Sequence, residues 1–287
     1  MDEPGAADLS QGLGHRVAPG LVYAGQAGAT RVRSGRRSSD TLWTRLARRH
    51  ARGHAESSTG VRATSAAARG ATPSGAGHDG SVSVSRGFRP KHFRWPTEDE
   101  RHRVPPGQRV ARGFPVLTAG AVPQVPDGGW RFEVVPVDPT ADVVGWTLDE
   151  LRRLPSETVT RDIHCVTRWS KLDTTWEGVP VDVLLDAVPE AGARVVEAWC
   201  WGGYTTNLPL DDVTGGKAWV VWSYDGQPLT PEHGGPLRLL VPHLYFWKSA
   251  KWLRALRLLP EDAPGFWETA GYHNRGDPWR EQRRAGD

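Results

Sequence analysis

A change in composition near Trp95 limits what this chain can fold into. Residues 1–90 consist largely of Ala, Gly, Arg and Ser, with few aromatic residues and no sustained periodicity. Such a segment cannot bury enough apolar surface to offset chain entropy, so we predict that it is disordered. A short helix over 41–52 is predicted within this segment. The alternatives to an unstructured extension are a nucleic-acid-binding arm and an over-long gene model, in which translation starts further along the chain. Twelve of the fourteen tryptophans follow Trp95, so residues 95–287 are expected to form the folded domain.

Charge is divided at the same place. Residues 1–95 hold 15 Lys and Arg against 6 Asp and Glu, whereas residues 96–287 hold 21 against 27. The net charge of +3 therefore originates in the N-terminal segment. Because the domain itself is acidic, its charge argues against nucleic-acid binding.

The number of cysteines and the hydropathy of the chain indicate the cellular compartment of the protein. Two cysteines are too few for a disulfide framework, and no CxxC spacing indicates a structural zinc site. We therefore expect a reducing, cytoplasmic location. The sequence has no run of eighteen apolar residues, so no membrane span is predicted. Neither of the N-terminal pairs Arg36-Arg37 and Arg48-Arg49 precedes the apolar stretch of an export signal, so export is not predicted.

Short alternating segments separated by Gly, Pro and Asp predict many strands and few helices. The segment Pro105–Pro126 is expected to be an irregular wrapping segment, and Thr147 with Glu150 forms a capping box that begins a short helix. A second helix is predicted over 181–187 and a helical turn over 264–270. Strands are predicted over 130–137, 143–146, 158–165, 194–200, 204–210, 217–224, 236–242 and 252–259. The predicted fold class is α+β, with mixed β-sheets, short helices and one core.

Cys165 ends a predicted strand, and a loop with two tryptophans is expected to follow it up to a helix near Pro180. Arg168 and Lys171 flank the thiol, and neighbouring cations favour a thiolate with a lowered pKa. The chemistry leaves three roles open for this thiol: a nucleophile, a metal ligand or a buried apolar filler. A thiol enzyme with His164 as the base is disfavoured, because neighbours on a strand point to opposite faces.

A second polar cluster follows further along the chain. His233 precedes two glycines and Arg238, and the segment Lys248–Lys251 adds two lysines. Glycines allow backbone N–H groups to approach a ligand, and the cations supply positive charge in an acidic domain. This pattern suits a phosphate or another anion; a solvated edge with scattered charges is the alternative. No Walker A or GxGxxG motif supports ordinary nucleotide binding.

Six stretches carry a resemblance to a known family. They are R-G-F-P-V-L at Arg112–Leu117, H-C-V-T-R-W-S at His164–Ser170, W-E-G-V-P at Trp176–Pro180, G-Y-T-T-N-L-P-L at Gly203–Leu210, H-G-G-P-L-R-L-L-V-P at His233–Pro242 and K-S-A-K-W-L at Lys248–Leu253. In these stretches the chain resembles the sulfite-oxidase-type molybdopterin oxidoreductases, above all the small bacterial members that carry only the molybdenum-cofactor domain. The resemblance covers two thirds of the chain, leaves out residues 1–90, and implies a sulfite-oxidase-like molybdopterin-binding fold.

The resemblance also implies roles for individual residues. Cys165 would be the single protein ligand to molybdenum, since a soft thiolate suits a metal bound by a pterin dithiolene. His233 and Arg238 would contact the pterin or its phosphate. Cys200 is expected to be a thiol of the core or one that lies behind the residues contacting the cofactor. Further contacts with the molybdenum–molybdopterin cofactor are implied, from the remaining motifs and the wrapping segment, for His102, Phe114, Thr206, Lys248, Ser249 and Lys251.

Arg168 departs from the C-A-G-N-R-R pattern of sulfite oxidases, whose arginines surround an anionic substrate. It is the second candidate catalytic residue, as a cation that binds an anion near the metal. An ion pair with Asp162 or Asp173 is the alternative role. His243 and Tyr245 are expected either to line the pocket or to pack in the core.

The resemblance implies oxygen-atom transfer on a small oxyanion or sulfur compound, as sulfite oxidation or sulfoxide reduction. No haem domain or immunoglobulin-like dimerisation domain of the larger enzymes is recognised in the sequence. We therefore expect a monomer that exchanges electrons with an external partner, such as a cytochrome or a quinone-linked protein. The alternative from another functional class is a molybdenum-cofactor binding or carrier protein without turnover.

Overall fold

The computed structural model describes residues 30–31, 83–84 and 92–287. The predicted helix over 41–52 and most of the segment predicted to be disordered lie outside the described residues. Inside that segment, β1 (Thr30–Arg31) and β2 (Ser83–Val84) are strands of two residues each. Within the described ranges, none of the helices has the length and apolar character that a membrane crossing requires.

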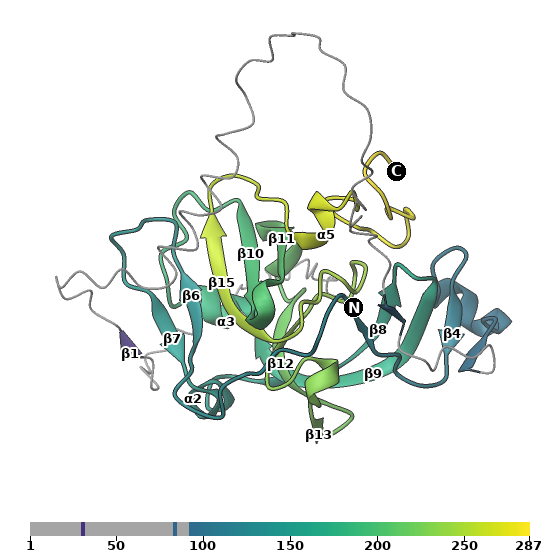
Figure 1. The fold of residues 1–287 in the computed structure, drawn as a ribbon, viewed down its shortest axis with the longest axis horizontal. Coiled ribbons are helices and arrows are strands. Elements are labelled where there is room, and N and C mark those ends of the chain that lie inside the picture. Colours follow the sequence, from purple (N-terminus) through teal and green to yellow (C-terminus); the bar gives the residue numbers. More distant parts are fainter. Residues whose placement is uncertain (1–29, 32–82, 85–91) are drawn as a thin grey trace, which may run out of the picture.

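A six-stranded mixed sheet forms one side of the domain, with the order β1-β7-β6-β15-β10-β11 (Figure 1). Its neighbouring strands are antiparallel except for β15 and β6, which run parallel. The predicted strands over 130–137, 143–146, 194–200, 204–210 and 252–259 all lie in this sheet. Their observed bounds are β6 (Phe132–Val135), β7 (Val144–Trp146), β10 (Val195–Cys200), β11 (Thr205–Pro209) and β15 (Leu253–Leu259).

A seven-stranded sheet forms the other side, with a central path β13-β12-β9-β4-β3 and with β14 paired to β12 and β8 paired to β9. The irregular segment after Pro105 contributes β4 and also β5 (Leu117–Thr118), which pairs with β2. The other bounds are β3 (Phe93–Arg94), β4 (Arg109–Ala111), β8 (Glu157–Cys165), β9 (Trp169–Pro180), β12 (Trp219–Tyr224), β13 (Gln227–Pro228) and β14 (Arg238–Leu240).

The prediction of a loop after Cys165 was wrong. Residues 169–180 form β9, which pairs antiparallel with β8 along nearly its whole length, so Cys165 faces Trp169 across a tight hairpin. Arg168 has a φ of 70°, and Arg168 N donates to Cys165 O (3.0 Å), which closes the turn. Trp169, Ser170, Thr174 and Trp176 are buried, whereas residues 171–173 and Thr175 are partly or fully exposed. The segment is therefore a half-buried strand rather than a loop.

The helices of the described residues are short. The predicted capping box is confirmed at α2 (Leu148–Arg152), where Thr147 N donates to Glu150 Oε2 (2.7 Å) and Glu150 N donates to Thr147 Oγ1 (3.2 Å). The other α-helices are α3 (Val181–Leu185), α4 (Leu210–Val213) and α5 (Phe266–Thr269). Three 3-10 turns, η2 (Glu98–Arg103), η3 (Trp201–Gly203) and η4 (Pro231–His233), complete the set. Mixed sheets with short helices confirm the predicted α+β class.

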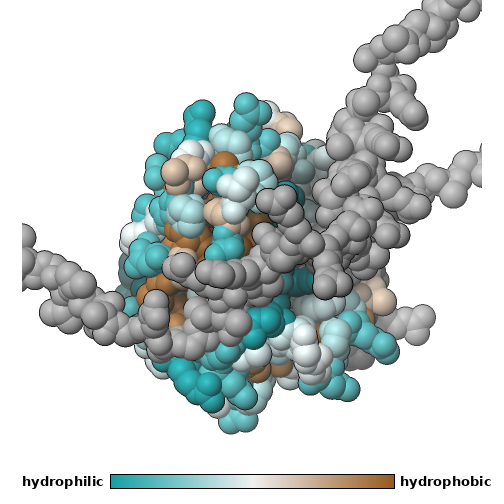
Figure 2. All heavy atoms as spheres, turned by 90° about the vertical axis from the view of Figure 1, so that its left-hand side faces the viewer, coloured by the Kyte–Doolittle hydropathy of each residue, from teal (hydrophilic) through white to brown (hydrophobic). Residues whose placement is uncertain are grey.

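Two apolar clusters hold the sheets together. The larger cluster joins β6, β7, α3 and β10, and it contains Cys200 as expected of a core thiol. The smaller cluster surrounds the β8–β9 hairpin and contains Cys165, Trp169 and Trp176. Figure 2 shows apolar patches between hydrophilic residues on the side of the six-stranded sheet. The larger cluster also contains residues of β9, β12 and β14, so it lies between the two sheets, whereas Cys165 belongs to the smaller cluster, whose buried strand residues all come from the seven-stranded sheet.

Candidate functional site

A cavity of about 270 Å³ opens beside Cys165. Its walls come from segments that are far apart in the sequence: the wrapping segment, the β8–β9 turn, η3, η4 with β14, the segment before β15, and α5. The lining side chains that bear charge, sulfur or a ring are Phe114, Cys165, Trp169, Trp201, Tyr204, Glu232, His233, Arg238, Phe246, Trp247, Lys251, Trp252, Phe266, Trp267 and Tyr272. Aromatic rings therefore surround a small number of polar groups, which is the usual composition of a ligand site.

Cys165 is buried at the cavity wall. Its Sγ lies 3.2 Å from Thr167 Oγ1 in the hairpin turn. Burial raises the thiol pKa, while the contact with Thr167 and the charge of Arg283 oppose that rise. The predicted lowering of the Cys165 pKa by Arg168 and Lys171 was therefore wrong for the protein alone. The physical reason is that desolvation outweighs nearby charge, and the cation that acts on the thiol lies on the C-terminal segment.

His164 faces away from Cys165, as the strand alternation predicts. Its Nδ1 donates to Ser170 Oγ (2.9 Å), and Ser170 Oγ in turn donates to Gln108 Oε1 (3.0 Å). Gln108 Nε2 closes the chain by donating to Cys165 O (3.3 Å). Burial lowers the pKa of His164 to about 4, so the ring is neutral at physiological pH. This buried relay fixes the backbone of the Cys165 turn and provides no base for the thiol.

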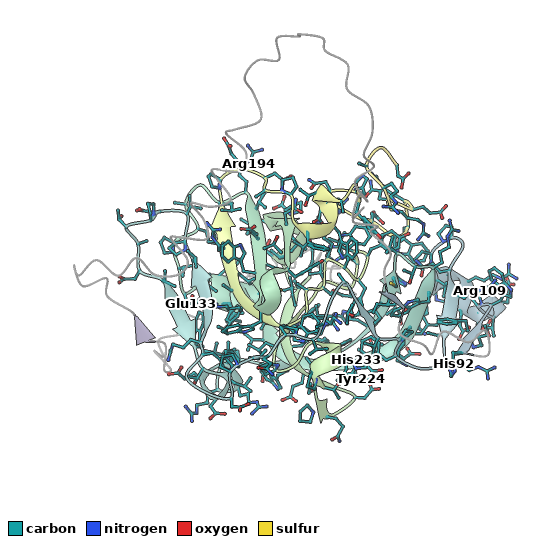
Figure 3. All side chains as sticks on the ribbon, viewed as in Figure 1. His92, Arg109, Glu133, Arg194, Tyr224 and His233 are labelled. Carbon is teal, nitrogen blue, oxygen red and sulfur yellow. The ribbon has the colours of Figure 1, made fainter. Side chains whose placement is uncertain are left out.

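His233 and Phe114 form one wall of the cavity. Their rings lie 4.1 Å apart, and His233 Nε2 donates to Phe114 O (3.3 Å) while Thr230 Oγ1 lies 3.1 Å from His233 Nδ1. The Nε2–H tautomer follows, because a carbonyl only accepts. Burial lowers the His233 pKa, so the ring is neutral. Tyr224 lies against the same Phe114 ring (4.9 Å), and Figure 3 shows Tyr224 and His233 together near the base of the domain.

Two cations reach the cavity, and main-chain carbonyls hold both. Arg238 is buried and donates through Nη1 to His233 O (2.9 Å) and through Nη2 to Ser249 O (2.8 Å). Lys251 Nζ donates to Leu117 O (2.8 Å) and Glu232 O (2.9 Å). Since these partners are neutral carbonyls, no direct ion pair within the described part of the chain cancels the positive charge.

Burial lowers the pKa of both cations. The pKa of Arg238 falls to about 9, so the guanidinium keeps its charge at neutral pH. The pKa of Lys251 falls to about 7, because the positive charge of Arg238 adds to the effect of burial. An anion in the cavity would stabilise the charged form of both side chains. The two residues therefore provide an anion-binding wall.

Five of the residues predicted to bind the cofactor line the cavity with Cys165: Phe114, His233, Arg238, Ser249 and Lys251. Ser249 takes part through its main chain, since its Oγ accepts from Val241 N (2.9 Å). His102 lies in η2, and its side chain is exposed and outside the cavity lining. Arg168 is also exposed and outside the lining.

Thr206 and Lys248 lie behind the cavity wall rather than in it. Lys248 Nζ pairs with Glu268 Oε1 (2.6 Å) and donates to Asn207 O (2.7 Å). Thr206 Oγ1 and Trp247 Nε1 donate to the same carboxylate, at 3.0 and 2.9 Å. Lys248 and Glu268 are both buried. This network ties α5 and β11 to Trp247, whose ring lines the cavity.

The sequence analysis missed the glycine turn at η3. Gly202 and Gly203 have φ values of 82° and 84°, which favour glycine, and both line the cavity. A Cβ at Gly203 would meet no atom within 4 Å, so its backbone borders open space. The Gly-Gly pair one residue after the predicted strand over 194–200 was the available signal. Arg283 was also missed, because no local pattern relates it to Cys165.

The donor set fits a molybdopterin cofactor. Within the described residues, no group of three or more His, Cys, Asp or Glu side chains could hold a metal ion by itself. A metal at this cavity would thus have one protein thiolate, from Cys165, and would take its other ligands from a bound group. Arg238 Nε, Trp169 Nε1 and Trp201 Nε1 are buried on lining residues without an acceptor among the described residues. They leave hydrogen-bonding capacity for the acceptors of a pterin.

Comparisons with known proteins agree with this fit. The family model described as "Oxidoreductase molybdopterin binding domain" matches residues 119–267. The uncharacterised oxidoreductase YuiH of Bacillus subtilis is 45% identical over 187 residues, which cover 64% of this chain and 93% of YuiH.

More distant relatives are longer than the matched region. YedZ1 of Azospira oryzae, provisionally named a protein-methionine-sulfoxide reductase subunit, is 32% identical over 58% of this chain and 64% of its own length. Rat mitochondrial sulfite oxidase is 26% identical over 53% of this chain and 33% of its own length. The solved sulfane dehydrogenase SoxCD of Paracoccus pantotrophus has 22% identity and a TM-score of 0.40, covering 46% of this chain and 38% of that chain. Because the family model matches more than half of the chain, this protein belongs to the sulfite-oxidase-type molybdopterin oxidoreductases, as an enzyme with a molybdopterin cofactor.

Proposed function

We propose that this enzyme transfers an oxygen atom between a molybdenum centre bound through Cys165 and a small oxyanion or sulfur compound. The reaction would be sulfite oxidation or sulfoxide reduction, the two activities that the names of the rat and Azospira relatives indicate. The observation that carries the proposal is the position of one buried thiol in the wall of a cavity whose cations are held by carbonyls. Such a cavity offers one metal ligand together with a site for an anionic cofactor.

The bound cofactor would supply the two-electron chemistry, and the residues of this chain would bind and orient it. Cys165 would give its thiolate to the metal, and metal binding would replace the proton that burial favours. Arg238 and Lys251 would bind the anionic end of the cofactor through the N–H groups that remain free for it. Phe114 and His233 would pack against the pterin, and Ser249 would position Arg238 through its carbonyl.

Two further residues would act on the cofactor indirectly. Thr206 and Lys248 hold Glu268 behind the wall, and we propose that they fix the ring of Trp247 rather than contact the cofactor. His102 is placed outside the cavity lining, so the geometry favours a surface role for it. Arg168 is exposed at the turn after Cys165, and we propose that it binds an anionic substrate near the metal.

Electrons would pass to or from an external protein, as a cytochrome or a quinone-linked carrier. We further propose that residues 95–287 form one domain that works as a monomer in the cytoplasm. Both cysteines are unpaired, which is compatible with a reducing compartment. Gel filtration with light scattering and cell fractionation would test these two points.

Elemental analysis tests the metal site. Protein from a molybdenum-competent host should carry about one molybdenum per chain, and Cys165→Ser should lose the metal or its thiolate-to-metal absorption. Cys200→Ser is the matched control, because Cys200 is also buried but lies outside the lining; its metal content should be unchanged. Wild-type protein that stays free of molybdenum would contradict the proposal.

Two activity assays test the direction of the reaction. Sulfite oxidation would be measured with an artificial electron acceptor, and sulfoxide reduction with a reduced viologen dye. Turnover in either assay supports oxygen-atom transfer. Protein that holds the cofactor but is inactive in both assays, over a panel of substrates, would instead be a cofactor-binding or carrier protein.

A further inference from the structure

Gln108 is a buried polar side chain that reaches Cys165 from a distant part of the sequence. It is 2% exposed and directly precedes β4, which pairs in parallel with β9 and lies beside it in Figure 1. Its Nε2 donates to Cys165 O (3.3 Å), across 57 positions of the chain. Gln108 lies outside the cavity lining, so it reaches the candidate metal ligand through the main chain of Cys165.

The local sequence places Gln108 by a tight turn. Gln108 N donates to Pro105 O (3.3 Å), and Gly107 has a φ of 68°. A proline in second position, here Pro106, followed by a residue with positive φ makes this a type II turn, whose third position favours glycine. The sequence P-P-G-Q thus ends the irregular approach to β4 at one defined residue.

The amide of Gln108 has one orientation that satisfies its neighbours. A carbonyl oxygen only accepts, so the atom facing Cys165 O is the amide nitrogen. Gln108 Oε1 then accepts from Ser170 Oγ (3.0 Å), and Ser170 Oγ accepts from His164 Nδ1 (2.9 Å). All three side chains are buried. They hold each other in a single arrangement that directs one donor at Cys165.

The carbonyls on both sides of Cys165 are held as well. His164 O accepts from Phe246 N (2.8 Å), and Val166 O accepts from Arg283 Nη1 (2.7 Å). The three donors come from the start of β4, from the segment before β15 and from the C-terminal segment. The main chain at Cys165 is therefore fixed by parts of the fold that are far apart in the sequence.

The carbonyl of Cys165 itself accepts two hydrogen bonds. One comes from Arg168 N (3.0 Å) and belongs to the main chain of the hairpin turn. The other comes from the Gln108 side chain. A substitution of Gln108 therefore removes a contact with Cys165 while the hydrogen bond of the turn remains.

We propose that Gln108 is a positioning residue, whose hydrogen bond to the Cys165 carbonyl sets the orientation in which the Cys165 thiolate meets molybdenum. Groups that hold a metal ligand in place determine how tightly the metal binds and tune its properties. This role rests on the proposed function, in which Cys165 is the molybdenum ligand. Because Gln108 lies outside the cavity lining, its effect on the metal passes through Cys165.

Gln108→Met in the molybdenum-loaded enzyme tests the role. Methionine has a similar length, but its thioether cannot donate a hydrogen bond. The thiolate-to-metal absorption and the electron paramagnetic resonance spectrum of half-reduced molybdenum both depend on the orientation of the thiolate, so both should differ from wild type. Molybdenum should also leave the protein about tenfold faster, because loss of a group that holds a metal ligand weakens metal binding by about that factor.

Thr174→Val is the matched control. Thr174 is buried in the same hairpin, and its hydroxyl accepts from Trp176 Nε1 (2.7 Å) and donates to Arg161 O rather than to Cys165. The substitution keeps the shape of the side chain and removes its hydrogen bonds, so the melting temperature should fall. Both spectra should stay those of wild type, and the rate of molybdenum loss should stay within about twofold of wild type.

Ser170→Ala gives a graded effect. It removes the hydroxyl that orients the Gln108 amide but leaves the amide in place. Both spectra should change in the same direction as in Gln108→Met and by less, with molybdenum loss about threefold faster, the effect of one net hydrogen bond. If the melting curve shows that Gln108→Met does not fold, Ser170→Ala decides, and wild-type spectra in that variant would overturn the role.

Molybdenum loss is compared at an equal interval below the melting temperature of each variant. Wild-type spectra in folded Gln108→Met, or metal loss no faster than in Thr174→Val, would overturn the positioning role and leave the proposed function intact. Cys165→Ser protein that keeps the wild-type absorption would instead overturn the proposed function, and the positioning role with it.

Discussion

The buried pair of Lys248 and Glu268 gives the sharpest prediction of stability. The two side chains are 0% and 2% exposed, and Lys248 Nζ lies 2.6 Å from Glu268 Oε1. Lys248→Met would leave the carboxylate buried with only the neutral donors Thr206 and Trp247. Removing one partner of a buried ion pair costs about 3–5 kcal/mol of unfolding free energy. Because two donors remain, we expect about 3 kcal/mol, near the lower end of that range. Urea unfolding at neutral pH measures this loss of stability against wild type.

The double variant separates an ion pair from simple packing. Glu268→Gln in the Lys248→Met background removes the unpaired charge, so it should recover about 1–2 kcal/mol. The reasoning would be refuted by a Lys248→Met loss below about 1 kcal/mol, or by losses that add independently in the double variant. Retained far-ultraviolet circular dichroism of each variant is the control for a folded state.

Two further predictions concern the cavity. Gly276→Ala should lower the free energy of unfolding by about 1–3 kcal/mol, because a Cβ there would meet Trp247 Cζ2 at 2.6 Å and the φ of Gly276 is 76°. Gly120→Ala is the control: a Cβ at Gly120 would meet no atom within 4 Å, so the melting temperature should change little. The affinity of the anionic cofactor should fall as pH rises above about 7, because Lys251 then loses its proton in the free protein and cofactor binding must take one up. Lys251→Arg should remove this pH dependence. Cofactor-release curves from pH 6 to 9 that are identical in wild type and Lys251→Arg would contradict the prediction.

Much of the fold could be predicted from local patterns. The strands of the six-stranded sheet alternate apolar and polar residues, and the capping box at Thr147 and Glu150 needs only four residues to be recognised. The segment after Cys165 was misassigned because charged residues such as Lys171, Asp173 and Glu177 separate its buried residues. Its sequence therefore does not look like an apolar strand. Its strand state depends on pairing with β8, a tertiary effect.

The site could be predicted only in part. Ser249 and Lys251 lie in the recognisable motif Lys248–Leu253, and His233 and Arg238 lie in the motif His233–Pro242, so these lining residues could be predicted. By contrast, the pKa of Cys165 depends on burial and on Arg283, which is distant in sequence and has no local signature. Lys248 matches a motif of basic residues but pairs with Glu268, which no pattern on its own segment reveals.

The contacts that close the cavity have a kinetic consequence. Lys251 to Leu117, His233 to Phe114, and Arg283 to Val166 join residues 134, 119 and 117 positions apart. Loops of this length close slowly compared with a hairpin such as β8–β9. An early folding intermediate would already contain the hairpin while its thiol still faced solvent, and this is the stage at which a bulky cofactor has the widest path to Cys165.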